Sequence, residues 1–303
     1  MRVLILGAAG MLGHKVLQHL VARGDDVTGT VRDGRTKSAL ARLPLFAGHN
    51  ILWNVDALDW PGLRATVRAH QPDVVINALG IIKQRQLATS PIPSIQVNAL
   101  LPHLLAETLA PWNGRLVHIS SDCVFNGSRG HYTEDDPSDA DDLYGRTKCL
   151  GEVIGVANAI TLRSSIIGRE LRHHQSLLDW FLAQRGGQAE GYRRVIYAGL
   201  TTIEMARVID LVIHDHPGLA GLYQVASAAI SKHDLLVLLA AAFKLDVTIR
   251  PADTPVSDRS LSGARFQAAT GYAAPSWPEL TAALAADSTP YGEWLAMLAK
   301  PRP

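Results

Sequence analysis

The chain has 303 residues, of which 47% are hydrophobic and 19% are charged, values typical of a soluble globular protein with one large domain or one and a half. Its 29 basic and 28 acidic residues nearly balance, which gives no electrostatic reason to expect nucleic acid or a membrane surface as partner. The two cysteines, Cys123 and Cys149, form no C-x-x-C pair and predict neither a disulfide framework nor a zinc site. We find no signal-peptide pattern and no apolar run near the ~20 residues of a membrane span, and we therefore expect a cytoplasmic protein.

The first residues carry a glycine-rich turn between an apolar strand and a helix, with the spacing G-x-x-G-x-x-G. Glycine lets the backbone turn tightly and approach a ligand closely, and the start of a helix favours an anion. Strand, turn and helix together predict a cradle for the diphosphate of a dinucleotide. We expect it to be formed by Gly7, Gly10, Met11, Leu12 and Gly13.

The second predicted strand, residues 26–31, decides between the two nicotinamide cofactors. An acid at its tip would bind the adenosine ribose hydroxyls of NAD. Here Arg32 comes first, with Arg35 and Lys37 beyond it, which favours the 2′-phosphate of NADP over NAD. In the alternative, Arg32 is solvated and Asp33 reaches the ribose.

Further candidate contacts follow at the carboxyl ends of later strands, where open α/β sheets bind ligands. Asp56 stands where an adenine amino group could be met, and Ala78 and Gly80 let the chain pass the nicotinamide side of the cofactor. Lys83 is a candidate substrate contact or a solvated loop lysine, and Asn98 is a second candidate near the start of a helix.

The central stretch combines a buried strand that ends at Ser121 with a helix that carries Tyr144 and Lys148. The i, i+4 spacing puts phenol and ammonium on one helix face. We expect the lysine charge to lower the pKa of Tyr144, so that Ser121 can hydrogen-bond a substrate carbonyl while Tyr144 protonates it. Both helix residues could instead be ordinary surface side chains.

An acidic loop separates the two halves of this stretch, with six carboxylates between residues 134 and 142. We interpret them as capping and solvating a loop before a helix, because Asp and Ser are good N-caps. We therefore expect no metal site.

The rest of the chain continues the alternation of strands and helices. Further strands are predicted at residues 50–53, 73–79, 159–167, 195–198, 221–226 and 247–250, and helices at 60–70, 95–110 with a distortion at Pro102, 175–184, and from 202 and 231 onward. Alternation across roughly 230 residues predicts an α/β fold, a doubly wound, Rossmann-like parallel sheet with a smaller C-terminal substrate lobe. We assign residues 1–166 and about 195–228 to an NADP-binding domain, and about 167–194 and 229–303 to the substrate-binding lobe.

Glycine motif, strand-end serine and Y-x-x-x-K, in this order, resemble the extended short-chain dehydrogenase/reductase superfamily. Residues 120–127, 132–137 and 143–152 look like consecutive blocks of the dTDP-4-dehydrorhamnose reductase family. The resemblance implies that Ser121, Tyr144 and Lys148 carry catalysis and that Lys148 anchors the nicotinamide ribose.

The resemblance further implies an NADPH-dependent reductase of a nucleotide-diphosphate 4-keto-6-deoxy sugar, in surface-polysaccharide or deoxysugar biosynthesis. Arg259 would contact the substrate diphosphate, and Arg194 is a second candidate. The sequence leaves open whether the protein forms a homodimer.

Two alternatives remain within this resemblance. In enzymes like GDP-fucose synthase, a Cys two residues beyond the catalytic Ser works with a His to epimerise the sugar, and Cys123 and His174 stand in the corresponding places. Such an enzyme would be a bifunctional 3,5-epimerase/4-reductase of the same substrates. The other alternative is a catalytically inactive NADP-binding regulatory protein. A sugar 4,6-dehydratase is disfavoured, since Asp122 is followed by Cys123 rather than by Glu.

Overall fold

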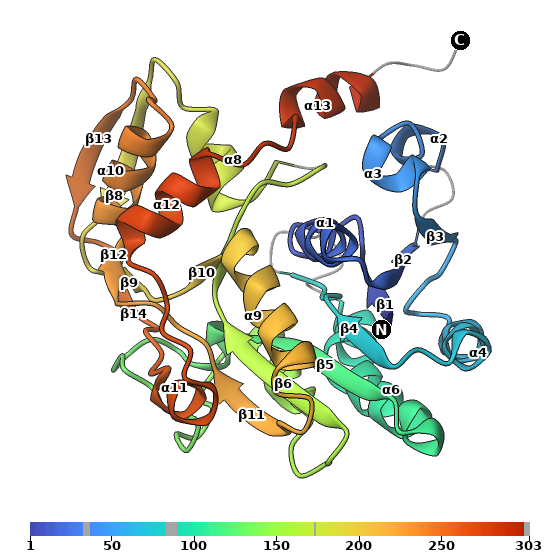
Figure 1. Ribbon diagram of the computed structural model, residues 1–303. Coiled ribbons are helices and arrows are strands. Elements are labelled where there is room, and N and C mark those ends of the chain that lie inside the picture. Colours follow the sequence, from blue (N-terminus) through green and yellow to red (C-terminus); the bar gives the residue numbers. More distant parts are fainter. Residues whose placement is uncertain (33–36, 83–89, 173, 300–303) are drawn as a thin grey trace.

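The computed structural model describes residues 1–32, 37–82, 90–172 and 174–299 (Figure 1). In this described part, the chain is built around a sheet of seven parallel strands in the order β11-β6-β5-β4-β1-β2-β3. Its strands are β1 (Arg2–Leu6), β2 (Asp26–Val31), β3 (Asn50–Trp53), β4 (Val74–Asn77), β5 (Arg115–Ser121), β6 (Ala159–Ser164) and β11 (Gly221–Gln224).

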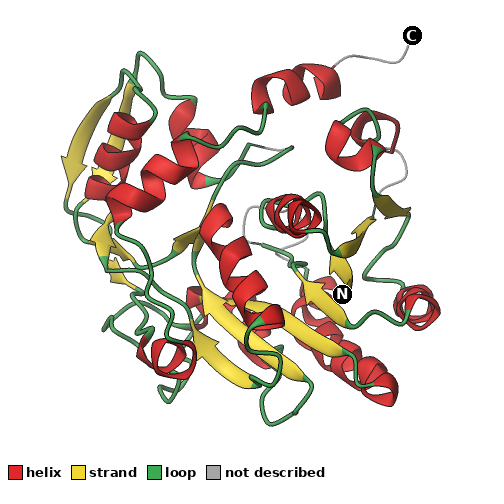
Figure 2. Cartoon of the chain, viewed as in Figure 1, coloured by secondary structure: helices red, strands yellow, loops and turns green. Residues whose placement is uncertain are grey.

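Helices cover both faces of the sheet (Figure 2), which is why most of its strand residues are buried. Alternate residues of β1 point to opposite faces. Leu4 and Leu6 pack with the helices α4 (Trp60–His70) and α6 (Leu101–Leu109). Val3 and Ile5 belong to the larger core with α1 (Gly13–Arg23) and α9 (Thr202–His214). The predicted doubly wound parallel sheet is confirmed.

The strand order places a crevice at one point of this sheet. From β1 the chain moves outward through β2 to β3 and then returns to β4 on the other side of β1. In such sheets ligands bind outside the carboxyl ends of the strands where the order reverses. The glycine-rich turn follows β1 directly and therefore lies at this reversal.

Smaller sheets with their own helices lie to one side of the main sheet (left in Figure 1). They are β8 (Gln188–Tyr192) with β13 (Thr248–Ala252), β9 (Val195–Tyr197) between β12 (Ile230–Ser231) and β14 (Ser257–Asp258), and β7 (Ile166–Ile167) with β10 (Leu200–Thr201). The other helices are α2 (Lys37–Leu40), α3 (Pro44–Ala47), α5 (Pro91–Ser94), α7 (Leu143–Leu150), α8 (Leu177–Leu182), α10 (Lys232–Ala242), α11 (Ala264–Thr270), α12 (Trp277–Ala285) and α13 (Tyr291–Ala299). The division into a cofactor domain and a substrate lobe stays a prediction. Among the described residues, no helix is both long and apolar enough to cross a membrane.

Two predicted elements are interrupted. The strand expected at residues 159–167 ends at Ser164, and Ile166–Ile167 leaves the main sheet to pair with β10. The helix expected at residues 95–110 begins as a π-helix, η3 (Ile95–Leu100), before α6. Pro102 has no N–H to donate to the fourth residue before it, which explains a widened turn just ahead of the proline.

A buried ion pair joins β6 to the chain that leaves α7. Arg163 Nε and Nη2 donate to the two carboxylate oxygens of Glu152 at 2.6 and 2.7 Å, and these side chains are 4% and 2% exposed. Ser120 on β5 also donates to Glu152, at 2.7 Å. Charges this deep stabilise a fold only as long as each keeps its partner.

We predict that Arg163→Met lowers the free energy of unfolding by about 3–5 kcal/mol, because it leaves the Glu152 carboxylate buried and unpaired. The matched control is Arg193→Met. It removes an equally bidentate pair with Asp253, at 2.8 and 2.6 Å, whose side chains are more than half exposed. Urea unfolding should show a large loss for the first variant and almost none for the second. Equal losses of stability in the two variants would contradict a special role for the buried Arg163–Glu152 pair.

Candidate active site

A cleft of about 540 Å³ opens where the strand order reverses. Seven of the predicted cofactor contacts line it, namely Gly7, Gly10, Met11, Arg32, Asp56, Ala78 and Gly80. The turn itself is closed by a hydrogen bond from the Gly10 N–H to the Gly7 carbonyl at 2.9 Å. The cleft therefore gathers residues that follow four different strands.

The turn fits the diphosphate cradle that its spacing predicts. A Cβ on Gly13 would come within 2.1 Å of the Gly7 carbonyl oxygen, so only glycine lets the helix start pack so close to the turn. Gly7 has a φ of +85°, in the left-handed region that glycine tolerates. Leu12 is buried behind the cleft at 7% exposure, so its side chain is core rather than lining.

A second part of the cleft lining, which we call the second wall, comes from residues that the sequence analysis did not mark. Glu170, Arg172 and Gln175 form it, just after β7. Glu170 holds the segment in shape, because its Oε2 accepts the N–H groups of Gln175 and Ser176 at 2.6 and 2.9 Å. No motif marks these residues, since they come from a loop whose position depends on tertiary packing.

The structure brings Ser121 and Tyr144 together, and they share a hydrogen bond. Helix α7 begins as predicted on a capping aspartate, since Asp142 Oδ1 accepts the Gly145 N–H at 2.7 Å. A Cβ on Gly145 would lie 2.1 Å from the Cys123 carbonyl oxygen. The missing side chain thus lets the first turn of α7 rest on the turn after β5, which places the phenol beside the serine.

The pKa of Tyr144 is raised above its ordinary value. Burial is the main cause, followed by the neighbouring Cys123, and the hydrogen bond with Ser121 acts in the opposite direction. The expectation that Lys148 lowers this pKa is therefore wrong, because desolvation outweighs any charge effect. The phenol keeps its proton at neutral pH, as a general acid must.

Lys148 lies one turn further along α7 and is 3% exposed. Its Nζ donates to the Ile119 carbonyl at 2.7 Å and lies 3.4 Å from Nε2 of His118, which is fully buried. Burial lowers the pKa of Lys148 to about 8, against the pull of Glu152. Burial, followed by the charge of Lys148, holds the pKa of His118 well below its usual range, so this histidine is neutral.

Lys232 and Arg259 form a cationic side of the site. Arg259 Nε donates to the Phe125 carbonyl at 2.9 Å. Lys232 begins α10 and interacts electrostatically with Asp122, Cys123 and Arg259, while burial lowers its pKa. Arg259 was anticipated, whereas Lys232 was not, because nothing in the local sequence distinguishes it from a solvated lysine.

The three-stranded sheet explains this convergence. Ser231 and Asp258, which precede Lys232 and Arg259, both pair with Ile196 of the central strand β9. The Asp258 N–H also donates to the Gly127 carbonyl at 2.7 Å. The sheet is thereby tied to the loop that follows the turn after β5.

Asn98 requires a correction. It is fully buried, its Oδ1 accepts the Ile81 N–H at 2.8 Å, and its Nδ2 donates to the Ile81 carbonyl and to Thr147 at 3.0 and 3.2 Å. It anchors the loop after β4 and is not a substrate contact.

Among the described residues, the remaining candidates from the sequence analysis do not line the cleft. Arg194 is exposed, and its charge acts on Asp253. Nδ1 of His174 lies 3.8 Å from Asp179, and this side chain is 42% exposed. Cys123 is partly buried beside Tyr144, so the epimerase alternative stays a prediction. Lys83 lies outside the described residues. No group of three metal-ligating side chains occurs among the described residues.

The hydroxyl of Ser121, the phenol of Tyr144 and the buried ammonium of Lys148 lie near the carboxyl end of β5, which pairs with β4, and the residues after β4 line the cleft. These three groups are the equipment for reducing a carbonyl. Fold and site therefore place the chain among the NAD(P)-dependent oxidoreductases. The sequence model of the RmlD substrate binding domain family matches residues 1–171, more than half of the chain, and the chain belongs to that family.

Two curated relatives carry related names. A protein of Streptomyces antibioticus named probable dTDP-4,6-dihydroxy-2-methyloxan-3-one 4-ketoreductase is 30% identical over 235 residues, 75% of this chain and 72% of that protein. A dTDP-4-dehydrorhamnose reductase of Streptomyces griseus is 34% identical over 152 residues, which cover 50% of this chain and 43% of that protein.

Among solved structures, the dTDP-4-dehydrorhamnose reductase of Bacillus anthracis, in complex with NADP, superposes with a TM-score of 0.77. The superposition covers 93% of this chain and 98% of that one, at 19% sequence identity. At this identity the match supports the fold alone.

Proposed function

We propose that the chain is an NADPH-dependent reductase of a nucleotide-diphosphate 4-keto-6-deoxy sugar, in surface-polysaccharide or deoxysugar biosynthesis. The observation that carries the proposal is the hydrogen-bonded pair of Ser121 and Tyr144, with buried Lys148 one turn behind, near the end of β5. This strand pairs with β4, and the residues after β4 line the cleft. The names of the relatives support the substrate class, since two of them are nucleotide-sugar reductases.

Bound NADPH supplies the hydride that reduces the sugar carbonyl carbon. Ser121 orients the carbonyl oxygen, and Tyr144 gives its proton to that oxygen as negative charge develops there. The raised pKa of Tyr144 keeps this proton in place until the oxygen becomes basic. The ammonium of Lys148 stabilises the phenolate that remains and anchors the nicotinamide ribose.

The cationic side of the site suits the other end of the substrate. Lys232 interacts electrostatically with Asp122 and Cys123, and Arg259 donates to the Phe125 carbonyl just after them, so both cations are near the Ser121 end of β5. A diphosphate needs such positive partners. We propose that both side chains hold the nucleotide-diphosphate while the sugar reaches Tyr144.

The decisive variant is Tyr144→Phe, assayed with NADPH and dTDP-4-dehydrorhamnose or other 4-keto nucleotide-sugars. Loss of the proton donor should lower kcat by about 10²–10⁴-fold and leave the Kd for NADPH nearly unchanged. Tyr132→Phe is the matched control, because this buried tyrosine stacks on Phe125 near the site without joining Ser121. Full turnover by Tyr144→Phe would refute the mechanism. A wild-type protein that binds NADPH but reduces none of these sugars would favour the regulatory alternative.

A second variant tests the preference for NADPH. Arg32 is exposed at the rim of the cleft, and a charge-assisted bond to the 2′-phosphate contributes about 1.5–3 kcal/mol. Arg32→Ala should weaken NADPH binding by about ten- to a hundredfold and barely affect NADH. Arg64→Ala on α4 removes the same charge from an exposed helix and serves as the control. Equal losses for both cofactors would show that Arg32 does not contact the 2′-phosphate.

A further inference from the structure

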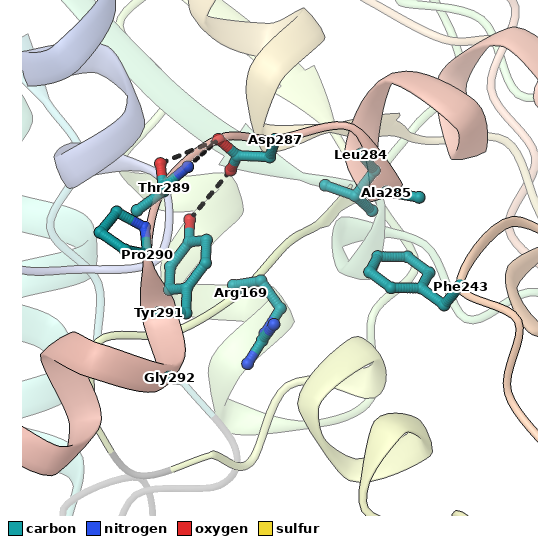
Figure 3. A pocket seen from close by; sticks show the side chains of 9 residues that line it. All are labelled: Arg169, Phe243, Leu284, Ala285, Asp287, Thr289, Pro290, Tyr291 and Gly292. Atoms are coloured by element: carbon teal, nitrogen blue, oxygen red, sulfur yellow. Dashed lines mark hydrogen bonds between the residues drawn. The ribbon is translucent and has the colours of Figure 1, made fainter.

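A segment near the end of the chain contacts both walls of the cofactor cleft. We call residues 287–294 the C-terminal clasp; it follows α12 and includes the first turn of α13. Figure 3 shows Asp287, Thr289 and Tyr291 of the clasp close to Arg169, around a cavity of about 260 Å³. The clasp lies outside residues 1–171 that match the family model.

The first wall is reached through His14, a fully buried residue at the start of α1. His14 Nδ1 lies 2.8 Å from the carbonyl oxygen of Gly10, which lines the cleft, and Nε2 lies 2.8 Å from the Tyr291 hydroxyl. Burial lowers the pKa of His14 to about 4, so the ring is neutral at pH 7. Because a carbonyl can only accept, the proton sits on Nδ1, which leaves Nε2 as an acceptor for the Tyr291 hydroxyl. Asp287 Oδ2, at 3.3 Å, is a second and more distant acceptor for the same hydroxyl. This places Tyr291 one hydrogen-bonded residue away from the glycine turn.

A second connection runs in parallel through the next residue of α1. Lys15 Nζ donates to both carboxylate oxygens of Asp287 at 2.9 Å and to the Thr289 hydroxyl at 3.1 Å. The side chains of Lys15 and Asp287 are each 9% exposed, so solvent screens this pair little. The clasp is therefore held firmly to the first turn of α1.

The other wall is reached through Arg169, whose guanidinium carbon lies 4.8 Å from the centre of the Tyr291 ring. Arg169 Nε also donates to Asp179 Oδ1 at 2.5 Å, and Asp179 Oδ2 accepts the Glu170 N–H at 2.6 Å. Glu170 lines the cleft as part of its second wall. Tyr291 thus contacts His14 through its hydroxyl and Arg169 through its ring. These two residues support the two walls of the cleft.

We propose that the C-terminal clasp sets the distance between the two walls of the cofactor cleft, and that Tyr291 is a positioning residue for dinucleotide binding. It acts through His14 on the Gly10 turn and through Arg169 on the Glu170 segment. The inference rests on the cofactor cleft alone and is independent of which sugar the protein reduces.

The test is direct NADPH binding to the full-length protein, without any sugar. Tyr291→Phe keeps the ring over Arg169 but removes the hydroxyl that His14 accepts from, and should weaken NADPH binding about three- to tenfold. Tyr272→Phe is the matched control, because its hydroxyl donates to Glu204 at 3.0 Å and it does not line the cleft. This control should leave NADPH binding unchanged at a similar loss of thermal stability.

Thermodynamic linkage gives a second test, which distinguishes a positioning role of Tyr291 from a purely structural one. If the clasp favours cofactor binding, the cofactor must stabilise the clasp by the same factor. Saturating NADPH should therefore slow amide hydrogen exchange in residues 287–294 of the wild type and have a smaller effect in Tyr291→Phe. An unchanged Kd in Tyr291→Phe, an equal loss in Tyr272→Phe, or exchange that NADPH does not slow would each overturn the proposal. Should Tyr291→Phe fail to fold, Asp287→Asn gives the same comparison through Lys15.

Discussion

The arrangement of the active site depends on the burial of one ammonium group, that of Lys148. Its Nζ has the Ile119 carbonyl as a hydrogen-bond acceptor, and its other close neighbour is a neutral histidine, His118. Asn77 Oδ1 accepts the Leu79 N–H, so the Asn77 amide presents its Nδ2 to His118 Nδ1, at 3.2 Å. The proton of His118 then sits on Nε2, facing Lys148, where it offers the ammonium no acceptor. Desolvation explains why the pKa of Lys148 is lowered to about 8, which suits a group that must respond to charge on Tyr144.

Such close burial requires that α7 lie tightly against the backbone around it. Glycines at both ends of the helix make this contact. A Cβ on Gly145 would clash with the Cys123 carbonyl oxygen at 2.1 Å, and one on Gly151 with the Asn98 carbonyl oxygen at 1.9 Å. At the second end the partner is the π-turn η3, whose widened backbone packs directly against α7. Backbone geometry therefore positions the phenol and the ammonium, and side-chain chemistry tunes them.

Periodicity and motif order were sufficient to predict the main sheet, because its strands are short apolar runs whose pairing follows from the doubly wound pattern. They also predicted that Ser121 and Tyr144 come together and that Lys148 follows Tyr144 on one helix, because the strand end and the helix start are both marked in the sequence. The catalytic roles of these residues stay a prediction. Lys232, Glu170 and Arg172 were missed, since they reach the site through small sheets and loops whose pairing is not local. Asn98 was misassigned because a polar side chain near a cleft can satisfy its own loop as readily as a ligand. The raised pKa of Tyr144 was missed for a related reason: spacing reveals a charged neighbour but not desolvation.

The central claim is that burial, rather than ion pairing with substrate or cofactor, sets the titration of Lys148. An NMR titration of the lysine side-chain carbons in the ligand-free protein, assigned with Lys148→Arg, measures it directly. The account predicts that the midpoint of Lys148 lies near pH 8, well below the ordinary value of 10.5, and that its signal is absent from the variant. A Lys148 midpoint at the ordinary value would contradict the account.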